Sequence, residues 1–106
     1  MERQSNCFTR LEALIGNDAI QTLGDKSVFV LGVGGVGGYV CEGLARSGVG
    51  HIILMDADCV DVTNINRQII ALHSTIGQYK VDVMKDRILD INPNCQVDVY
   101  PYFLNE

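Results

Sequence analysis

Three glycines and one aspartate in this chain have the spacing of a nucleotide-binding site. The glycines are Gly32, Gly34 and Gly37, in the pattern G-x-G-x-x-G. In such a loop the first glycine permits a tight turn, the second lets the backbone approach a phosphate, and the third lets a helix pack closely on the preceding strand. The N-terminus of that helix offers free N–H groups to an anion. Asp56 follows about twenty residues later, where an acid commonly accepts hydrogen bonds from ribose hydroxyls. The pattern predicts a nucleotide site without specifying the nucleotide.

Two more glycines in the same loop, Gly35 and Gly38, have two explanations. Either can bring the backbone close to a ligand, and either can let the helix pack tightly on the sheet. We favour packing for Gly38, and for Gly35 both explanations stay open.

The residues on both sides of the glycine loop predict a β-α-β unit. A short apolar run predicts a strand at Ser27–Leu31, with hydrophobic side chains on both faces, as in a parallel strand covered by helices. Helical spacing predicts a helix from about Val36 to Ser47, and a second apolar run predicts a strand at His51–Asp56. The apolar face of this helix is expected to contain Val36, Val40, Cys41, Leu44 and Ala45.

Further elements are predicted before and after this unit. From Thr9 onward the apolar residues have helical spacing with a break at Gly16, so two short helices are expected, the second capped by Asn17. Helical spacing also predicts a helix at about Val81–Ile91, and Gln96–Tyr100 has the alternation of a strand. The inward positions of the last helix are expected to be Val81, Met84, Ile88 and Ile91. Strands that alternate with helices indicate an α/β fold with a mainly parallel sheet.

The connection between Asp56 and the last helix is long and polar. Long ordered loops in compact domains are usually functional. Asn64 and Arg67 are three residues apart in this connection, so on a helical turn their side chains would point the same way. The connection is therefore a second candidate for site residues.

The composition limits the class of protein. The chain has 106 residues, enough for one small domain, and 47% of them are hydrophobic, which favours a packed core. No apolar run reaches transmembrane length and the N-terminus has no secretory pattern, so a cytoplasmic protein without a membrane partner is expected. The net charge of −5 provides no general basic field for nucleic acid. The four cysteines are scattered singly, without a C-x-x-C pair, and a chemical role of Cys59 stays open.

From Asp56 onward the residues resemble one enzyme family. The segment DADCVDVTNINRQI, followed by GQYK, is similar to the signature of the ubiquitin-activating superfamily of adenylating enzymes, which includes the bacterial adenylyltransferases of thiamine and molybdopterin synthesis. The family pattern is a glycine loop, an acid at the end of the second strand, N-x-x-R-Q and G-x-x-K, and all four parts are present in order. The segments ARSGVG, VTNINRQI, ALHSTIGQYK and RILDINP are most similar to the bacterial tRNA threonylcarbamoyladenosine dehydratases. The resemblance extends from Phe8 onward.

The resemblance implies a fold and a set of site residues. The fold would be the N-terminal half of a Rossmann-like three-layer architecture, with a mainly parallel sheet of order 3-2-1 and flanking helices. Asp56 would bind the ribose, and Gly35 would lie against the nucleotide. Asn64, Arg67 and Lys80 would surround the triphosphate of ATP, with Mg²⁺ as the second cofactor. In adenylation a carboxylate attacks the α-phosphate and pyrophosphate leaves, so cations stabilise the charge that develops. No Walker A sequence is present, and Arg67 and Lys80 supply these cations.

The resemblance also implies a homodimer and a longer protein. Arg10 matches an N-terminal arginine that reaches ATP from the partner subunit in relatives, although Cys7 replaces the arginine that precedes it in the family. In some relatives the residue that matches Arg67 likewise reaches the nucleotide across the dimer interface. In the superfamily the sheet continues, and a later aspartate that holds Mg²⁺ would lie beyond residue 106. Residues 1–106 are therefore expected to be the ATP-binding domain of a longer enzyme, and no metal ligand is assigned.

Four functions stay open. The first is ATP-dependent adenylation of the threonylcarbamoyladenosine carboxylate of tRNA, which would then cyclise with loss of water. The second is adenylation of the C-terminal glycine of a ubiquitin-like sulfur carrier. The third is nucleotide binding without catalysis, which we expect of the 106 residues by themselves. An NAD-dependent oxidoreductase is the fourth, because it shares the glycine loop and Asp56, but it gives no reason for Asn64, Arg67 and Lys80.

Overall fold

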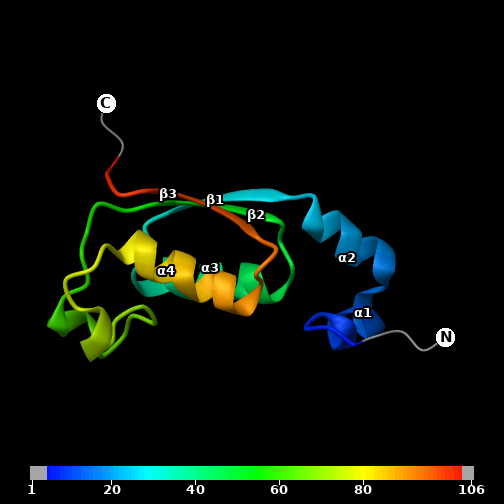
Figure 1. The fold of residues 1–106 in the computed structure, drawn as a ribbon, viewed down its shortest axis with the longest axis horizontal. Coiled ribbons are helices and arrows are strands. Elements are labelled where there is room, and N and C mark those ends of the chain that lie inside the picture. Colours follow the sequence, from blue (N-terminus) through cyan, green and yellow to red (C-terminus); the bar gives the residue numbers. More distant parts are fainter. Residues whose placement is uncertain (1–4, 104–106) are drawn as a thin grey trace.

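The computed structural model of the chain describes residues 5–103, so the two ends of the predicted domain, 1–4 and 104–106, lie outside the described part. Figure 1 shows the order of the elements along the chain. They are α1 (Thr9–Ile15), α2 (Asn17–Gly24), β1 (Ser27–Leu31), α3 (Gly35–Arg46), β2 (His51–Met55), the 3₁₀ turns η1 (Val62–Asn64) and η2 (His73–Thr75), α4 (Lys80–Ile91) and β3 (Gln96–Tyr100).

The three strands form one parallel sheet in the order β1-β2-β3. The register aligns Ser27 with His51 and His51 with Gln96, so the strands begin and end together. The two long helices α3 and α4 lie side by side on one face of this sheet (Figure 1). This confirms the predicted α/β class, the 3-2-1 order and the flanking helices. Within the described residues the sheet and this helical layer make up two layers.

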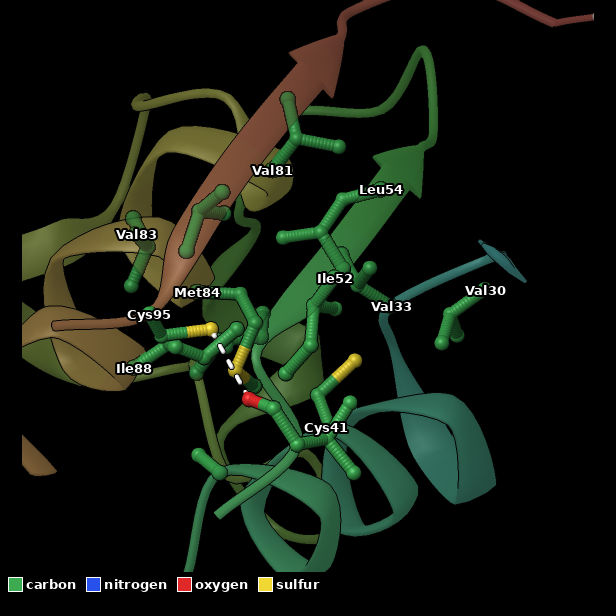
Figure 2. Close-up of a cluster of buried hydrophobic side chains, with 14 of the residues drawn as sticks. Val30, Val33, Cys41, Ile52, Leu54, Val81, Val83, Met84, Ile88 and Cys95 are labelled. Carbon is green, nitrogen blue, oxygen red and sulfur yellow. Dashed lines mark hydrogen bonds between the residues drawn. The ribbon is translucent and has the colours of Figure 1, made fainter. Parts of the chain in front are cut away.

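The core lies between the sheet and the two helices. Side chains at alternate positions of the strands point toward α3 and α4, because successive residues of a strand face opposite sides. Figure 2 shows these side chains packed against those of the helices. The buried residues of this core include Val30, Ile52, Leu54 and Val97 from the strands, Cys41 and Ala45 from α3, and Val81, Met84 and Ile88 from α4. The predicted inward positions of α4 are confirmed, with Ile91 partly buried at its end.

Two local predictions are wrong. Val36 was expected on the inward face of α3, but 80% of its surface is exposed, and Val40 is also exposed. The burial of Cys41 and Ala45, four residues apart, fixes which face of α3 meets the sheet, and Val36 falls outside it. Asn17 was expected to cap α2, but it is the first helical residue, and the cap is Gly16 with a φ of 88° and no side-chain hydrogen bond.

The other face of the sheet carries several apolar side chains that no described helix covers. We call this the open face, and its outward residues are Ser27, Phe29, Leu31, His51, Ile53, Met55, Gln96, Asp98 and Tyr100, of which Met55 is buried. Phe29 is 48% exposed and Leu31 is 56% exposed, because β1 is also an edge strand. Burial of β1 by helices on both faces was therefore a wrong expectation for the described residues.

The first two helices project away from the sheet (Figure 1). They pack on each other and contain no buried residue. The radius of gyration is 15.1 Å, compared with about 13 Å for a compact domain of this length. In the described part of the chain, no helix is long and apolar enough to cross a membrane.

Candidate nucleotide-binding site

The predicted site residues other than Arg10 come after the carboxyl ends of β1 and β2 in the chain. At these ends, backbone hydrogen bonds join neighbouring strands. The N–H group of Gly32 donates to the Met55 carbonyl at 2.8 Å, and that of Asp56 donates to the Tyr100 carbonyl at 3.2 Å. The first residue after β1 is thus tied to the end of β2, and the first residue after β2 to the end of β3. In open α/β sheets, ligands bind in the crevice beyond these strand ends.

Three glycines of the loop have separate structural reasons. Gly32 has a φ of 85°, a conformation that L side chains rarely adopt. A Cβ atom on Gly37 would lie 1.8 Å from the carbonyl oxygen of Gly32, so only glycine lets α3 pass this close to the loop. A Cβ on the buried Gly38 would lie 2.8 Å from the Val33 carbonyl oxygen and 3.0 Å from Ile69. Gly38 is therefore explained by close packing, but against the glycine loop and the connection rather than against the sheet.

The N-terminus of α3 has the features of an anion site. Its cap is Gly34, which provides no side-chain hydrogen bond, and no acidic residue lies in the first turn. The helix dipole and the N–H groups of this turn therefore favour a negative ligand. Gly35 has a φ of 48°, and a Cβ built on it would meet no atom within 4 Å. Packing does not explain Gly35, whereas its backbone conformation does.

Asp56 fastens the glycine loop to the connection that follows β2. Its Oδ2 atom accepts a hydrogen bond from the Val33 N–H at 3.0 Å, and its Oδ1 atom accepts one from the Asp58 N–H at 2.8 Å. The residue is 4% exposed. Each carboxylate oxygen can accept a second hydrogen bond, so the predicted ribose contact is compatible with these two bonds and stays a prediction.

Asn64 is buried and belongs to the turn that begins the connection. Its Oδ1 atom accepts a hydrogen bond from the Asp61 N–H at 2.8 Å, while the Asp61 carboxylate accepts one from the Thr63 N–H at 2.9 Å. The hydrogen bonds from Thr63 hold the pKa of Asp61 below its ordinary value. This reciprocal capping fixes the Asn64 side chain by its oxygen, which leaves the NH₂ group as the part that can donate to a ligand.

Lys80 begins α4 and has a buried side chain, 8% exposed. Its Nζ atom lies 3.9 Å from Oδ2 of Asp58, and its backbone N–H donates to the Asp58 carbonyl at 3.0 Å. Because the Asp58 N–H also donates to Asp56, a single residue joins the predicted ribose acid to the predicted phosphate-binding lysine. The structure thus brings Asp56 and Lys80 into one hydrogen-bonded cluster.

Arg67 is not part of this cluster. Its guanidinium is exposed and donates to the Thr63 carbonyl at 3.0 Å and to Oδ1 of Asn66 at 2.9 Å. Asn64 is buried in η1 whereas Arg67 is exposed in the turn after it, so the two side chains differ in burial. The expectation that they point the same way stays a prediction. The N–H groups of Arg67 and Gln68 donate to the Asn64 carbonyl at 3.2 Å and 2.9 Å, so a helical turn follows Asn64.

Arg10 lies far from these residues. It is exposed on α1, at the end of the molecule opposite to the carboxyl ends of the strands (Figure 1). Arg10 therefore does not line the site of its own chain. Its predicted role, a contact with the nucleotide of a partner subunit, stays a prediction.

Sequence reasoning missed Gln68 as a neighbour of the glycine loop. A Cβ on Gly34 would lie 2.7 Å from Oε1 of Gln68, so the side-chain amide occupies the space that this glycine leaves free. Among the described residues, Gln68 Oε1 is the buried side-chain atom that has no hydrogen-bond partner. The sequence signal was the position of Gln68 in N-x-x-R-Q, which by itself does not reveal the contact with Gly34.

The cysteines divide into buried and exposed thiols. Burial raises the pKa of the Cys41 thiol to about 12 and also raises the pKa of Cys95. These two thiols lie in the core and are unreactive at neutral pH. Cys59 is exposed and lies opposite Tyr79 in a short antiparallel bridge between the start and the end of the connection.

The parallel sheet, the glycine loop and the acid after β2 define a Rossmann-like α/β fold with a candidate nucleotide site. The model of the ThiF family matches residues 8–106, and the chain belongs to this family. Over 99 residues it is 57% identical to the tRNA threonylcarbamoyladenosine dehydratase of Bacillus subtilis, which covers 93% of this chain and 39% of the relative. It is also 38% identical over 101 residues to the ubiquitin-like modifier-activating enzyme 5 of Caenorhabditis briggsae, covering 92% of this chain and 23% of that protein.

A solved structure shows the same fold. The crystal structure of the Escherichia coli tRNA N6-threonylcarbamoyladenosine dehydratase in complex with ATP superimposes with a TM-score of 0.90 at 46% sequence identity. It covers 92% of this chain and 40% of the solved chain. The chain therefore spans about two fifths of the length of these two dehydratases.

Proposed function

We propose that this chain is the ATP-binding part of an enzyme that adenylates a carboxylate. The observation that carries the proposal is the cluster of Asp56, Asp58 and Lys80, which joins an acid suited to ribose and a cation suited to phosphate. This cluster lies next to the uncapped N-terminus of α3, because Asp56 also accepts a hydrogen bond from Val33 in the glycine loop. An acid, a free helix N-terminus and a cation fit the ribose and the phosphates of a nucleoside triphosphate.

The residues of the site suit the charges of the reaction. A carboxylate oxygen of the acceptor would attack the α-phosphorus, and the bond from that phosphorus to the pyrophosphate oxygen would break. The negative charge that develops would lie near the N–H groups of α3 and the ammonium of Lys80, which are fixed before the reaction. Arg10 and Arg67 are exposed in their own chain and would serve the nucleotide of a partner subunit in a homodimer.

No residue of the described part is assigned to Mg²⁺. Residues 5–103 contain no group of three or more histidine, cysteine, aspartate or glutamate side chains arranged to hold a metal ion. We therefore derive no step through a metal. Because the chain spans about two fifths of the two dehydratases, we infer that the metal ligands and the acceptor pocket belong to the rest of the protein. We also infer that the 106 residues alone bind nucleotide without turnover.

The proposed acceptor is the threonylcarbamoyladenosine of tRNA, and the proposal follows from the similarity to the Bacillus subtilis and Escherichia coli dehydratases. Once adenylated, the carboxylate would be attacked from within the same nucleoside and AMP would leave, which amounts to loss of water from the starting acid. The alternative acceptor is a ubiquitin-like protein, in keeping with the more distant activating enzyme 5. Release of pyrophosphate from ATP by the intact protein, with modified tRNA or with a carrier protein as acceptor, distinguishes the two.

The nucleotide itself can be tested by calorimetry with ATP and with NAD. We expect the intact protein to bind ATP more tightly than NAD, because Lys80 and the N-terminus of α3 favour a triphosphate. A preference for NAD would instead support the oxidoreductase and would contradict adenylation.

A further inference from the structure

Asp58 contacts two site residues through three different groups. Its backbone N–H donates to Oδ1 of Asp56 at 2.8 Å, and its carbonyl accepts from the backbone N–H of Lys80 at 3.0 Å. Its carboxylate is the third group, with Oδ2 at 3.9 Å from the Lys80 ammonium. The two backbone bonds persist with any side chain at position 58, whereas the third contact depends on the carboxylate.

The contact between the two charged groups is long and unequal in burial. The Lys80 side chain is 8% exposed and that of Asp58 is 60% exposed. A buried ammonium without a counter-charge is costly, so the carboxylate stabilises Lys80 in this position. At 3.9 Å, however, the two charged groups are beyond hydrogen-bonding distance, and the Asp58 carboxylate is largely exposed to water. A phosphate oxygen at a charge-assisted distance of about 2.8 Å would form a stronger contact with the same ammonium.

We propose that Asp58 is a positioning residue. Its carboxylate holds the Lys80 ammonium while no nucleotide is bound, and it releases the ammonium when the triphosphate binds. The inference rests on the proposed function, in which Lys80 contacts phosphate. When ATP binds, the Lys80 ammonium then exchanges its contact with the Asp58 carboxylate for a contact with a phosphate. The Asp58 carboxylate competes with the triphosphate for Lys80, and its negative charge stays close to the phosphates.

The test is Asp58→Asn in the intact protein, with calorimetry for ATP and adenosine. This variant keeps both backbone bonds and the shape of the side chain but removes the charge. We expect ATP affinity to rise about three- to fivefold, the scale of one partly exposed ion pair. Adenosine affinity should stay within about twofold, because adenosine has no phosphate to compete for Lys80.

Asp82→Asn is the matched control. Asp82 is exposed in the first turn of α4, so its loss changes the net charge equally without removing the partner of Lys80. ATP affinity should change less than about twofold in this control. In the Lys80→Ala background the gain from Asp58→Asn should disappear, as expected when two residues act on one contact.

The outcomes separate this inference from the function on which it rests. One outcome is that ATP affinity is unchanged or lower in Asp58→Asn while it is clearly lower in Lys80→Ala. This outcome overturns the role of Asp58 and leaves the proposed ATP site intact. Unchanged ATP affinity in Lys80→Ala overturns the phosphate contact itself. Thermal unfolding checks that the variants fold, and Asp58→Ser repeats the test with a shorter side chain. If neither variant folds, the carboxylate is structural and the proposal is wrong.

Discussion

At the scale of single residues, the site combines binding groups with the bonds that hold them. Asp56 is the clearest case, because both of its carboxylate oxygens already accept backbone hydrogen bonds, from Val33 and Asp58. Such an acid stabilises the loop whether or not a ribose is present. Its removal should therefore affect folding as well as binding.

Asp56→Ala should lower the free energy of unfolding by about 1–3 kcal/mol, because it leaves one buried and one partly buried N–H donor without their acceptor. Binding of adenosine and of ATP should weaken together, since a ribose contact does not need phosphates. Denaturant unfolding and calorimetry measure the two effects. Asp56→Asn is the control for folding, because its amide oxygen can keep one of the two bonds. Retention of wild-type adenosine affinity in a folded Asp56→Ala protein would contradict the ribose contact.

Arg67→Ala and Lys80→Ala should each slow ATP–pyrophosphate exchange by the intact enzyme about a hundredfold, the scale of one preorganised transition-state contact. ATP affinity should change less than the exchange rate. Lys26→Ala is the control, because Lys26 is exposed just before β1 and away from the carboxyl ends of the strands. Normal exchange in both site variants would mean that Arg67 and Lys80 have no catalytic role.

At the scale of elements, α3 is placed by contacts on two of its sides. One side approaches the glycine loop so closely that a Cβ on Gly37 would lie 1.8 Å from a backbone oxygen. Another side is joined to α4 by Glu42, whose Oε1 atom accepts hydrogen bonds from Nε of Arg87 at 2.8 Å and from Nη2 at 2.6 Å. Both contacts fix the direction of the helix N-terminus that faces the proposed phosphates.

Gly37→Ala should therefore destabilise the protein by on the order of 2–4 kcal/mol, because the backbone must move to accept the methyl group. Gly43→Ala is the matched control in the same helix. A Cβ there meets no atom within 4 Å, so the better helix propensity of alanine should stabilise the protein by about 0.5–1 kcal/mol. Chemical denaturation measures both values, and equal effects of the two substitutions would contradict the close approach.

The bond between α3 and α4 should be sensitive to pH. Partial burial raises the pKa of Glu42, but the hydrogen bonds from Arg87 and Arg46 outweigh it and hold the pKa below its ordinary value of 4.5. A carboxyl with a lower pKa in the folded state contributes stability above its ordinary pKa, and this contribution is lost as the pH falls through the lowered value.

Arg87→Met should consequently cost about 0.5–1 kcal/mol at neutral pH, and the difference from the wild type should shrink as the pH falls below about 4.5. Urea unfolding at pH 7 and at pH 3–4 measures the difference. Arg46→Met is the control, because its bond to Glu42 is longer, at 3.3 Å, and more exposed. A difference that is independent of pH would show that Arg87 acts only by packing.

At the scale of the whole molecule, β1 leaves two surfaces without a partner in the described residues. It is an edge strand, and its side chains Phe29 and Leu31 belong to the open face. Edge strands with apolar residues tend to pair with other chains, and an exposed apolar patch favours association. The open face is large because α3 and α4 both cover the opposite side of the sheet (Figure 1).

The isolated 106-residue chain should therefore self-associate, at least partly through β1. Light scattering over a concentration series measures this, and Leu31→Lys should lower the apparent mass. Val30 is unsuitable for such a test, because it is buried in the core. Leu72→Lys is the control, since Leu72 is similarly exposed but lies in the connection outside the open face. A monomer at every concentration would contradict the prediction.

The sequence by itself determined the local elements and the class of site. The three strands, the two long helices and the glycine loop were predicted within a residue or two, because apolar periodicity and glycine spacing are local signals. Asp56 was predicted for the same reason, since the β-α-β unit fixes its distance from the loop. The family resemblance supplied the roles of Asn64, Arg67 and Lys80, which spacing alone does not provide.

Only the tertiary structure decided the directions of side chains and the contacts between distant segments. The connection buries Asn64 and leaves Arg67 exposed, and the contact of α3 with the sheet turns Val36 outward. Gln68 fills the space beside Gly34, and Asp58 joins Asp56 to Lys80, although Asp58 and Lys80 are 22 positions apart in the chain. These contacts depend on how the connection folds back between β2 and α4. A local pattern carries no information about such a path, because it is set by packing of residues far apart in the sequence.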